Sequence, residues 1–116
     1  MNVEILKATG INYEDGLKRF ASKVPLYEKY LMKFPEDECF FNIKTSMEAK
    51  NYEEDFKAAH AFKGVTGNLS LETLYKVVYD FVECLRNNSN IEKAEELFVD
   101  VTKEYNRMVD VINSQM

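Results

Sequence analysis

Apolar residues recur at spacings of three and four along most of the chain, which is the periodicity of amphipathic helices. No stretch between turn signals alternates strictly between apolar and polar residues, so we expect no strands. The pattern predicts an all-α fold whose helices cover approximately residues 3–8, 13–20, 25–34, 36–50, 52–68, 71–85 and 91–113.

The last two predicted helices have the most regular apolar seams. In the final helix the seam consists of Ile91, Ala94, Phe98, Val101, Tyr105, Met108 and Ile112. The loop signal Asn87-Asn88-Ser89-Asn90 separates it from the helix before, and helices joined by a short loop pack antiparallel. Together with the two preceding helices, they are expected to form an up-down antiparallel four-helix bundle. The short N-terminal helices would be additional elements that cap one end.

Several helix ends carry recognisable sequence signals. Asn12 is a predicted N-cap, and Pro25 fits the first turn of a helix, where its missing N–H costs nothing. Asn51 followed by Glu54 resembles a capping box that opens the helix over residues 52–68. Ser70 is expected to cap the helix after it.

Length and composition indicate one helical domain that spans residues 1–116. No apolar run approaches the roughly 20 residues that a membrane span needs, and the N-terminus does not read as a signal peptide. The net charge is -5, and 15 Lys and Arg are scattered among 20 Asp and Glu. Nucleic acid and anionic membranes are therefore not expected partners, because both require clustered basic residues.

The cysteines and the helix seams bear on location and assembly. Cys39 and Cys84 are far apart in the sequence and form no Cys-x-x-Cys motif. They are typical of buried thiols in a cytoplasmic protein rather than of a disulfide framework. We expect a monomer, because the apolar seams are used up within one bundle.

His60 is the only histidine in the chain, and it lies in a predicted helix close to Gly64 and Gly67. A glycine inside a helix lowers the stability of the helix by about 1 kcal/mol relative to alanine. Two glycines beside one histidine therefore suggest that something large has to reach the histidine side chain. On a helical wheel both glycines and Phe56 fall within about 40° of His60, and Lys57 and Lys63 within about 60°.

The opposite side of this wheel is the side that should enter the core. It holds Ala59, Phe62, Thr66 and Leu69, between about 100° and 180° from His60. His60 is therefore expected to be exposed to solvent.

An exposed imidazole is largely neutral at pH 7 and offers a free ring nitrogen as a nucleophile. Lys63, one turn away, can offset the charge of a phosphoryl group, and the two glycines leave room for a donor's active site. The alternative is an ordinary surface histidine, with Lys63 as a solvated charge. Phe56 and Lys57 are candidate docking residues, although Phe56 also fits the edge of the core.

The segment Ala59-His60-x-x-Lys63-Gly64-x-x-Gly67-Asn68-Leu69 resembles the signature of the histidine-containing phosphotransfer (HPt) domain. The segment before it, with Gly10-Ile11-Asn12, Leu17, Phe20, Tyr27, Leu31 and Phe34, is also similar to this family. Ser70-Leu71 departs from the Gly-Ala pair that is common after the signature.

The resemblance implies a phosphorelay intermediate whose partners are response-regulator receiver domains, such as those of a hybrid sensor kinase. His60 would be the phosphoacceptor and Lys63 the phosphoryl support. Gly64, and more weakly Gly67, would give access. Mg²⁺ would belong to the receiver, so the chain needs no cofactor or metal of its own.

Three other functions compete with this hypothesis. A self-sufficient kinase is excluded, because no glycine-rich nucleotide loop is present, and the chain looks free-standing rather than part of a hybrid kinase. A helical interaction bundle without covalent chemistry remains the main alternative. A metal site is the weakest, because one histidine and two distant cysteines form no ligand set.

Overall fold

The computed structural model describes residues 1–115, and these residues form an all-helical fold without a strand. The helices are α1 (Val3–Thr9), α2 (Tyr13–Arg19), α3 (Val24–Lys33), α4 (Cys39–Glu48), α5 (Tyr52–Asn68), α6 (Glu72–Leu85) and α7 (Ile91–Asn113). Short 3-10 turns, η1 (Phe34–Glu36) and η2 (Arg86–Asn88), lie before α4 and after α6. The predicted all-α class is confirmed.

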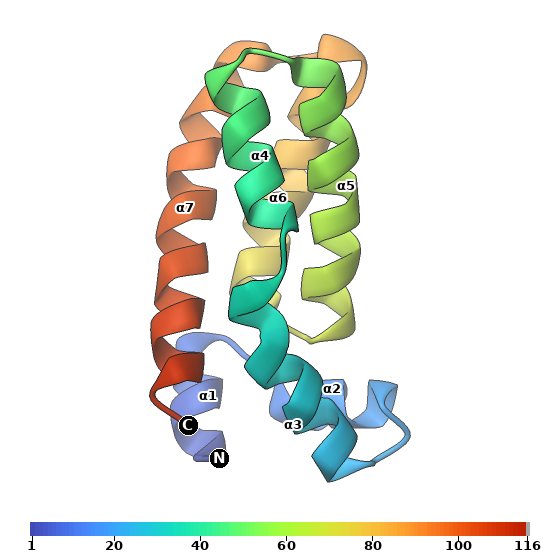
Figure 1. Ribbon diagram of the computed structural model, residues 1–116, viewed down its shortest axis with the longest axis vertical. Coiled ribbons are helices and arrows are strands. Elements are labelled where there is room, and N and C mark those ends of the chain that lie inside the picture. The colour runs from blue at the N-terminus through green and yellow to red at the C-terminus, as the bar shows by residue number, and fades with distance from the viewer. Residues whose placement is uncertain (116) are drawn as a thin grey trace.

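The helices α4, α5, α6 and α7 run side by side along the long axis of the molecule, and each reverses the direction of the one before it (Figure 1). Consecutive helices of this set pack against one another: α4 on α5, α5 on α6, and α6 on α7. The helices α1, α2 and α3 lie at the lower end, where both ends of the chain also lie (Figure 1).

An aromatic cluster joins α4 to α7. The rings of Phe40 and Tyr105 are nearly parallel, with an interplanar angle of 7° and centroids 4.0 Å apart. Phe34 and Phe62 also pack against Tyr105. Aromatic pairs of this kind contribute about 0.5–1.5 kcal/mol beyond the burial of their apolar area. The cluster thus fixes α4 and α7 beside the core face of α5.

Asparagine side chains cap the N-termini of α2 and α5, as the sequence predicts. The Asn12 side chain accepts a hydrogen bond from the Asp15 N–H, and the Asn51 side chain from the Glu54 N–H. Only half of the predicted capping box forms, because the Asn51 N–H donates to the Ser46 carbonyl instead of to Glu54. Pro25 lies in the first turn of α3, also as predicted.

Two predicted helix starts are wrong. Ser70 does not cap α6: Leu71 is the N-cap, while Ser70 adopts a left-handed conformation with φ of 56°. Its hydroxyl donates to Oδ2 of Asp15 and is thereby drawn away from the N-terminus of α6. The helix predicted over residues 36–50 is α4, and it begins at Cys39 rather than at Glu36. Asp37 is extended, and its side chain accepts a hydrogen bond from the Cys39 N–H.

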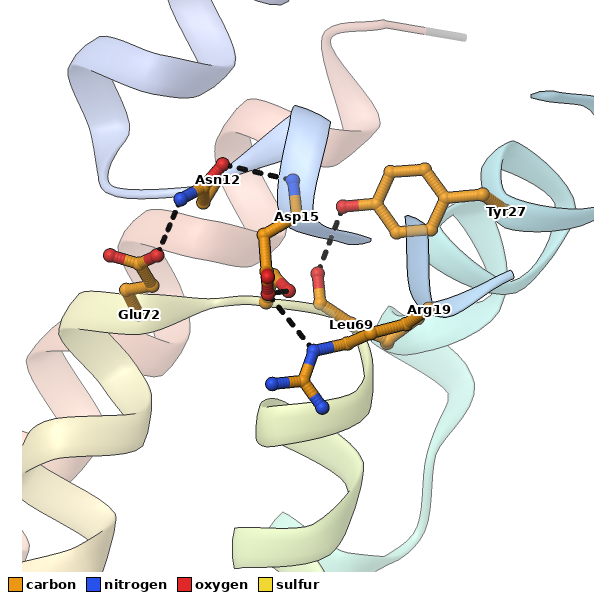
Figure 2. Close-up of polar contacts among 7 residues, drawn as sticks. Asn12, Asp15, Arg19, Tyr27, Leu69 and Glu72 are labelled. Atoms are coloured by element: carbon orange, nitrogen blue, oxygen red, sulfur yellow. Dashed lines mark hydrogen bonds and ion pairs between the residues drawn. The ribbon is translucent and has the colours of Figure 1, made fainter. Parts of the chain in front are cut away.

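The turn between α5 and α6 is held by the N-terminal segment, as Figure 2 shows. The Asn12 N–H donates to the Ser70 carbonyl, and the Glu72 N–H donates to the carbonyl of Gly10. Tyr27 of α3 donates to the Leu69 carbonyl over 2.9 Å. These three bonds, with the link between α1 and α2 and with α3, fix the end of α5 that carries the two glycines.

Close packing of α2 on α3 requires glycine at position 16. A Cβ atom there would lie 2.4 Å from the Tyr27 ring, which is far inside van der Waals contact. Because Tyr27 is buried and bonded to the turn after α5, it has little freedom to move aside. Gly16 therefore serves the fold that supports the end of α5.

Candidate functional site

The imidazole of His60 is exposed on the outer face of α5, as the wheel predicts. Its helix is oriented by Ala59, Phe62 and Thr66, which are fully buried on the opposite side. Leu69 is also buried at the end of the same face. The only histidine of the chain is thus available to a partner, with a packed core behind it.

Phe56 lies one turn before His60 and is half-buried. Its ring centroid is 5.9 Å from that of the imidazole, and the two planes are inclined by 50°. The guanidinium of Arg86, from the turn after α6, lies 5.1 Å from the centre of the Phe56 ring. Phe56 thus contacts both the imidazole and a cation that the sequence did not single out.

The two lysines beside His60 have different surroundings. Lys57 is exposed and pairs with Glu54 at 3.3 Å, a surface ion pair that contributes little to stability. Lys63 is half-buried, and its Nζ lies 5.2 Å from the centre of the Tyr79 ring on α6. No ion pair engages Lys63 within residues 1–115, so its charge remains available to an anion.

We call the outward-facing residues of α5 around the imidazole the His60 stripe: Phe56, Lys57, His60, Lys63, Gly64 and Gly67. Its two glycines also differ. A Cβ atom at Gly64 would have no other atom within 4 Å, so the surface there is open. A Cβ atom at Gly67 would lie 3.2 Å from Cε2 of Tyr75 on α6. Gly64 therefore leaves free space next to His60, whereas Gly67 allows Tyr75 to lie close against α5.

A groove of about 510 Å³ begins beside this stripe, between α2, α5 and α6. Lys63, Gly64 and Gly67 line one wall of the groove, and Arg19 and Lys76 contribute two further cations. His60 and Phe56 lie outside it. The candidate residues are thus brought together along α5, but they form an open surface rather than one enclosed pocket.

Two carboxylates also line the groove, and both are engaged by neighbours. Asp15 accepts hydrogen bonds from Ser70 and from Nε of Arg19, at 2.9 Å (Figure 2). The Ser70 hydroxyl, followed by Arg19, lowers the pKa of Asp15 below its ordinary value. Glu72 accepts a hydrogen bond from the Asn12 side chain. The cations of the groove are therefore only partly offset.

Asp55 is a second unusual group on α5, and the sequence reasoning missed it. The side chain is fully buried, and neither carboxylate oxygen has a hydrogen-bond partner among the described residues. Burial, followed by the charge of Glu95, raises its pKa from 3.8 to about 7. The wheel contained the signal, since Asp55 falls about 140° from His60, on the core face.

No protein-family model, curated protein or solved structure matches this chain. Within residues 1–115, no helix is long and apolar enough to span a membrane. The same residues contain no group of three or more His, Cys, Asp or Glu side chains placed to share a metal ion. The function therefore has to be argued from the His60 stripe itself.

Proposed function

We propose that this chain is a histidine phosphotransfer protein, a phosphoryl carrier rather than a kinase. His60 accepts a phosphoryl group from the aspartate of one receiver domain and passes it to another. The observation that carries the proposal is the combination on α5 of one exposed imidazole, an open surface at Gly64 and an unpaired cation at Lys63 within the described residues. Its place of action is the cytoplasm.

The arrangement of the helices supports this proposal. We take α4, α5, α6 and α7 as an up-down four-helix bundle, with α1, α2 and α3 as the elements that cap one end. This is the architecture that the resemblance to the HPt family implies. It presents His60 near the middle of a long helix that is buried on its other side, so a partner can approach from solvent without disturbing the core.

The chemistry requires only one nucleophilic nitrogen from this chain. The lone pair of a neutral imidazole nitrogen attacks the phosphorus of the receiver's aspartyl phosphate. The bond from phosphorus to the aspartate oxygen breaks, and its electron pair remains on the aspartate carboxylate. The proton on the second ring nitrogen is released to water or retained. In the next step the carboxylate of another receiver attacks phosphorus and returns the electron pair to the imidazole.

The neighbours of His60 assist this transfer in distinct ways. The Lys63 ammonium can form a charge-assisted hydrogen bond to a phosphoryl oxygen. Gly64 leaves space for the receiver's active site, which would also bring the Mg²⁺ that offsets charge on phosphorus. Phe56 and Lys57 flank the imidazole on the previous turn and are positioned to contact the docked receiver.

The alternative is an interaction bundle that binds a partner without covalent chemistry. Exposed apolar side chains on other helices favour it, since Phe41 of α4 is 67% exposed and Val99 of α7 is 55% exposed. Such a protein would bind through a surface that does not depend on the imidazole. Substituting His60 therefore separates the two functions.

The test is transfer of labelled phosphate from a panel of phosphorylated receiver domains encoded in the same genome. The proposal predicts label on this chain that is lost in acid and retained in alkali, as expected of phosphohistidine. His60→Gln should abolish the labelling while leaving the helical content unchanged. Transfer that survives the substitution, or the absence of transfer from every receiver in the panel, contradicts the proposal.

A further inference from the structure

The ammonium of Lys63 does not extend freely into solvent, although it makes no ion pair within the described residues. Its Nζ lies 5.2 Å from the centre of the Tyr79 ring on the neighbouring helix. A lysine side chain has four rotatable bonds and loses much conformational freedom when it is held in one place. Contact with a fixed aromatic face removes part of that freedom before any phosphoryl group arrives.

We infer that Tyr79 is a positioning residue, which holds the Lys63 ammonium beside the phosphoryl site on His60. The inference rests on the proposed function, and it adds a residue of α6 to a site otherwise built on α5. Tyr79 itself is not expected to touch the phosphoryl group. It acts through Lys63, one helical turn from the imidazole.

The position of the Tyr79 ring is supported by its neighbour on α6. The rings of Tyr75 and Tyr79, which are four residues apart, have centroids separated by 6.3 Å. Tyr75 in turn lies close against α5, because Gly67 has no side chain to hold it away. Gly67 therefore contributes through the packing of Tyr75, and the contacts run from Gly67 through Tyr75 and Tyr79 to Lys63.

The contact between Lys63 and Tyr79 is weak enough to let the ammonium reach a phosphoryl group. Tyr79 is 45% exposed, and a cation–π contact at an exposed site is weak. A hydrogen bond from an ammonium to a phosphoryl oxygen has charge on both partners and is stronger. Lys63 can thus turn its ammonium toward a phosphoryl oxygen on His60 while its side chain stays against the Tyr79 ring, which limits the conformations that it must search.

The experiment measures the rate at which phosphoramidate, a small phosphoryl donor, phosphorylates His60. The imidazole nitrogen forms the bond to phosphorus while the P–N bond of the donor breaks and ammonia leaves. No receiver is involved, so docking does not affect the rate. Tyr79→Leu should slow the reaction by about two- to fivefold, the range expected of an exposed cation–π contact. Tyr79→Phe retains the aromatic face and should react at the rate of the natural chain.

Two controls separate positioning from a general effect on the fold. Tyr30 on α3 has the same exposed fraction as Tyr79, and Lys29 lies 5.9 Å from its ring centre. Tyr30→Leu removes this equivalent pair and should leave the rate unchanged. In a Lys63→Met background, Tyr79→Leu should cause no further loss, because no cation remains to be positioned.

Nuclear magnetic resonance provides a readout independent of phosphorylation. The ε-methylene protons of Lys63 should be shifted upfield by the Tyr79 ring current in the natural chain and in Tyr79→Phe, but not in Tyr79→Leu. Unshifted protons in the natural chain, or an unchanged rate in Tyr79→Leu while Lys63→Met is slow, would overturn the inference alone. If neither phosphoramidate nor any receiver phosphorylates His60, the proposed function fails and the inferred role falls with it.

Discussion

The aromatic ring of Phe56 lies 5.9 Å from the imidazole of His60, one turn earlier on α5. Two consequences follow from this contact. The ring limits the orientations open to the imidazole, and it brings the Arg86 guanidinium, 5.1 Å from the Phe56 ring, toward the same surface. Phe56 therefore links the proposed phosphoacceptor to the turn after α6.

Replacing Phe56 by leucine should alter the imidazole without unfolding the chain. Leucine retains most of the apolar volume at this half-buried position but has no ring current. The His60 C–H signals should therefore move in proton spectra, and they are easily identified because the chain has one histidine. Phosphorylation by phosphoramidate should slow by less than tenfold, since the nucleophile remains. Unmoved imidazole signals would show that the two rings are not in contact.

The two glycines near His60 should respond differently to alanine. At Gly64 the new Cβ meets nothing, so Gly64→Ala should raise the free energy of unfolding by about 0.4–1 kcal/mol, through the reduced freedom of the unfolded chain. At Gly67 the Cβ lies 3.2 Å from Tyr75, whose ring must shift. Gly67→Ala should gain less, or lose stability. Urea unfolding of both variants checks this order, and an equal gain would contradict it.

A large side chain at Gly64 should distinguish a loss of receiver access from a loss of His60 reactivity. Gly64→Leu should fold normally and react with phosphoramidate at close to the natural rate, because a small donor avoids the leucine. Transfer from a phosphorylated receiver should slow severely. If Gly64→Leu unfolds the chain, or slows both donors equally, Gly64 does not serve to admit a partner.

Asp55 should make the stability of the fold fall as the pH rises. Its pKa is raised from 3.8 to about 7, so the folded chain retains a proton that the unfolded chain loses. The stabilising contribution of the neutral carboxyl is fully present below about pH 3.8 and is lost as the pH rises through about 7. Asp55→Asn should therefore stabilise the chain increasingly over this interval, by at least about 1 kcal/mol at pH 8.

Urea unfolding at several pH values measures this difference. Glu53→Gln is the matched control, because Glu53 is an exposed acid in the same first turn of α5. It should leave the pH dependence unchanged. A difference between Asp55→Asn and the natural chain that stays constant from pH 4 to pH 8 would show that Asp55 is not buried as a neutral carboxyl.

Sequence periodicity was sufficient for those parts of the fold that local signals determine. The bounds of α7 and the caps at Asn12 and Asn51 were predicted correctly, because apolar spacing and side-chain capping depend on neighbours in the chain. Ser70 was misread because its hydroxyl has a partner 55 residues away, at Asp15. A hydrogen bond between residues so far apart in the chain cannot be predicted from the spacing of apolar and capping residues around Ser70.

In the candidate site, too, the features that depend on one helix were predictable from the sequence, and the contacts between helices were not. The exposure of His60 follows from the helical wheel, and so does the open surface at Gly64. The contacts of Tyr79 with Lys63 and of Arg86 with Phe56 depend on how α6 packs beside α5. They could be found only once the two helices were placed. Gly67 was predicted, more weakly, as a second access position, and the structure adds that a Cβ atom there would lie against Tyr75.

The central claim concerns one imidazole, and the most direct measurement observes that ring during transfer. Proton and phosphorus spectra of the untagged chain are recorded before and after addition of a phosphorylated receiver. The account predicts that the His60 C–H signals shift and couple to phosphorus, and that they return when a second, unphosphorylated receiver is added. Signals that remain unchanged while the receivers exchange phosphoryl groups through this chain would contradict it.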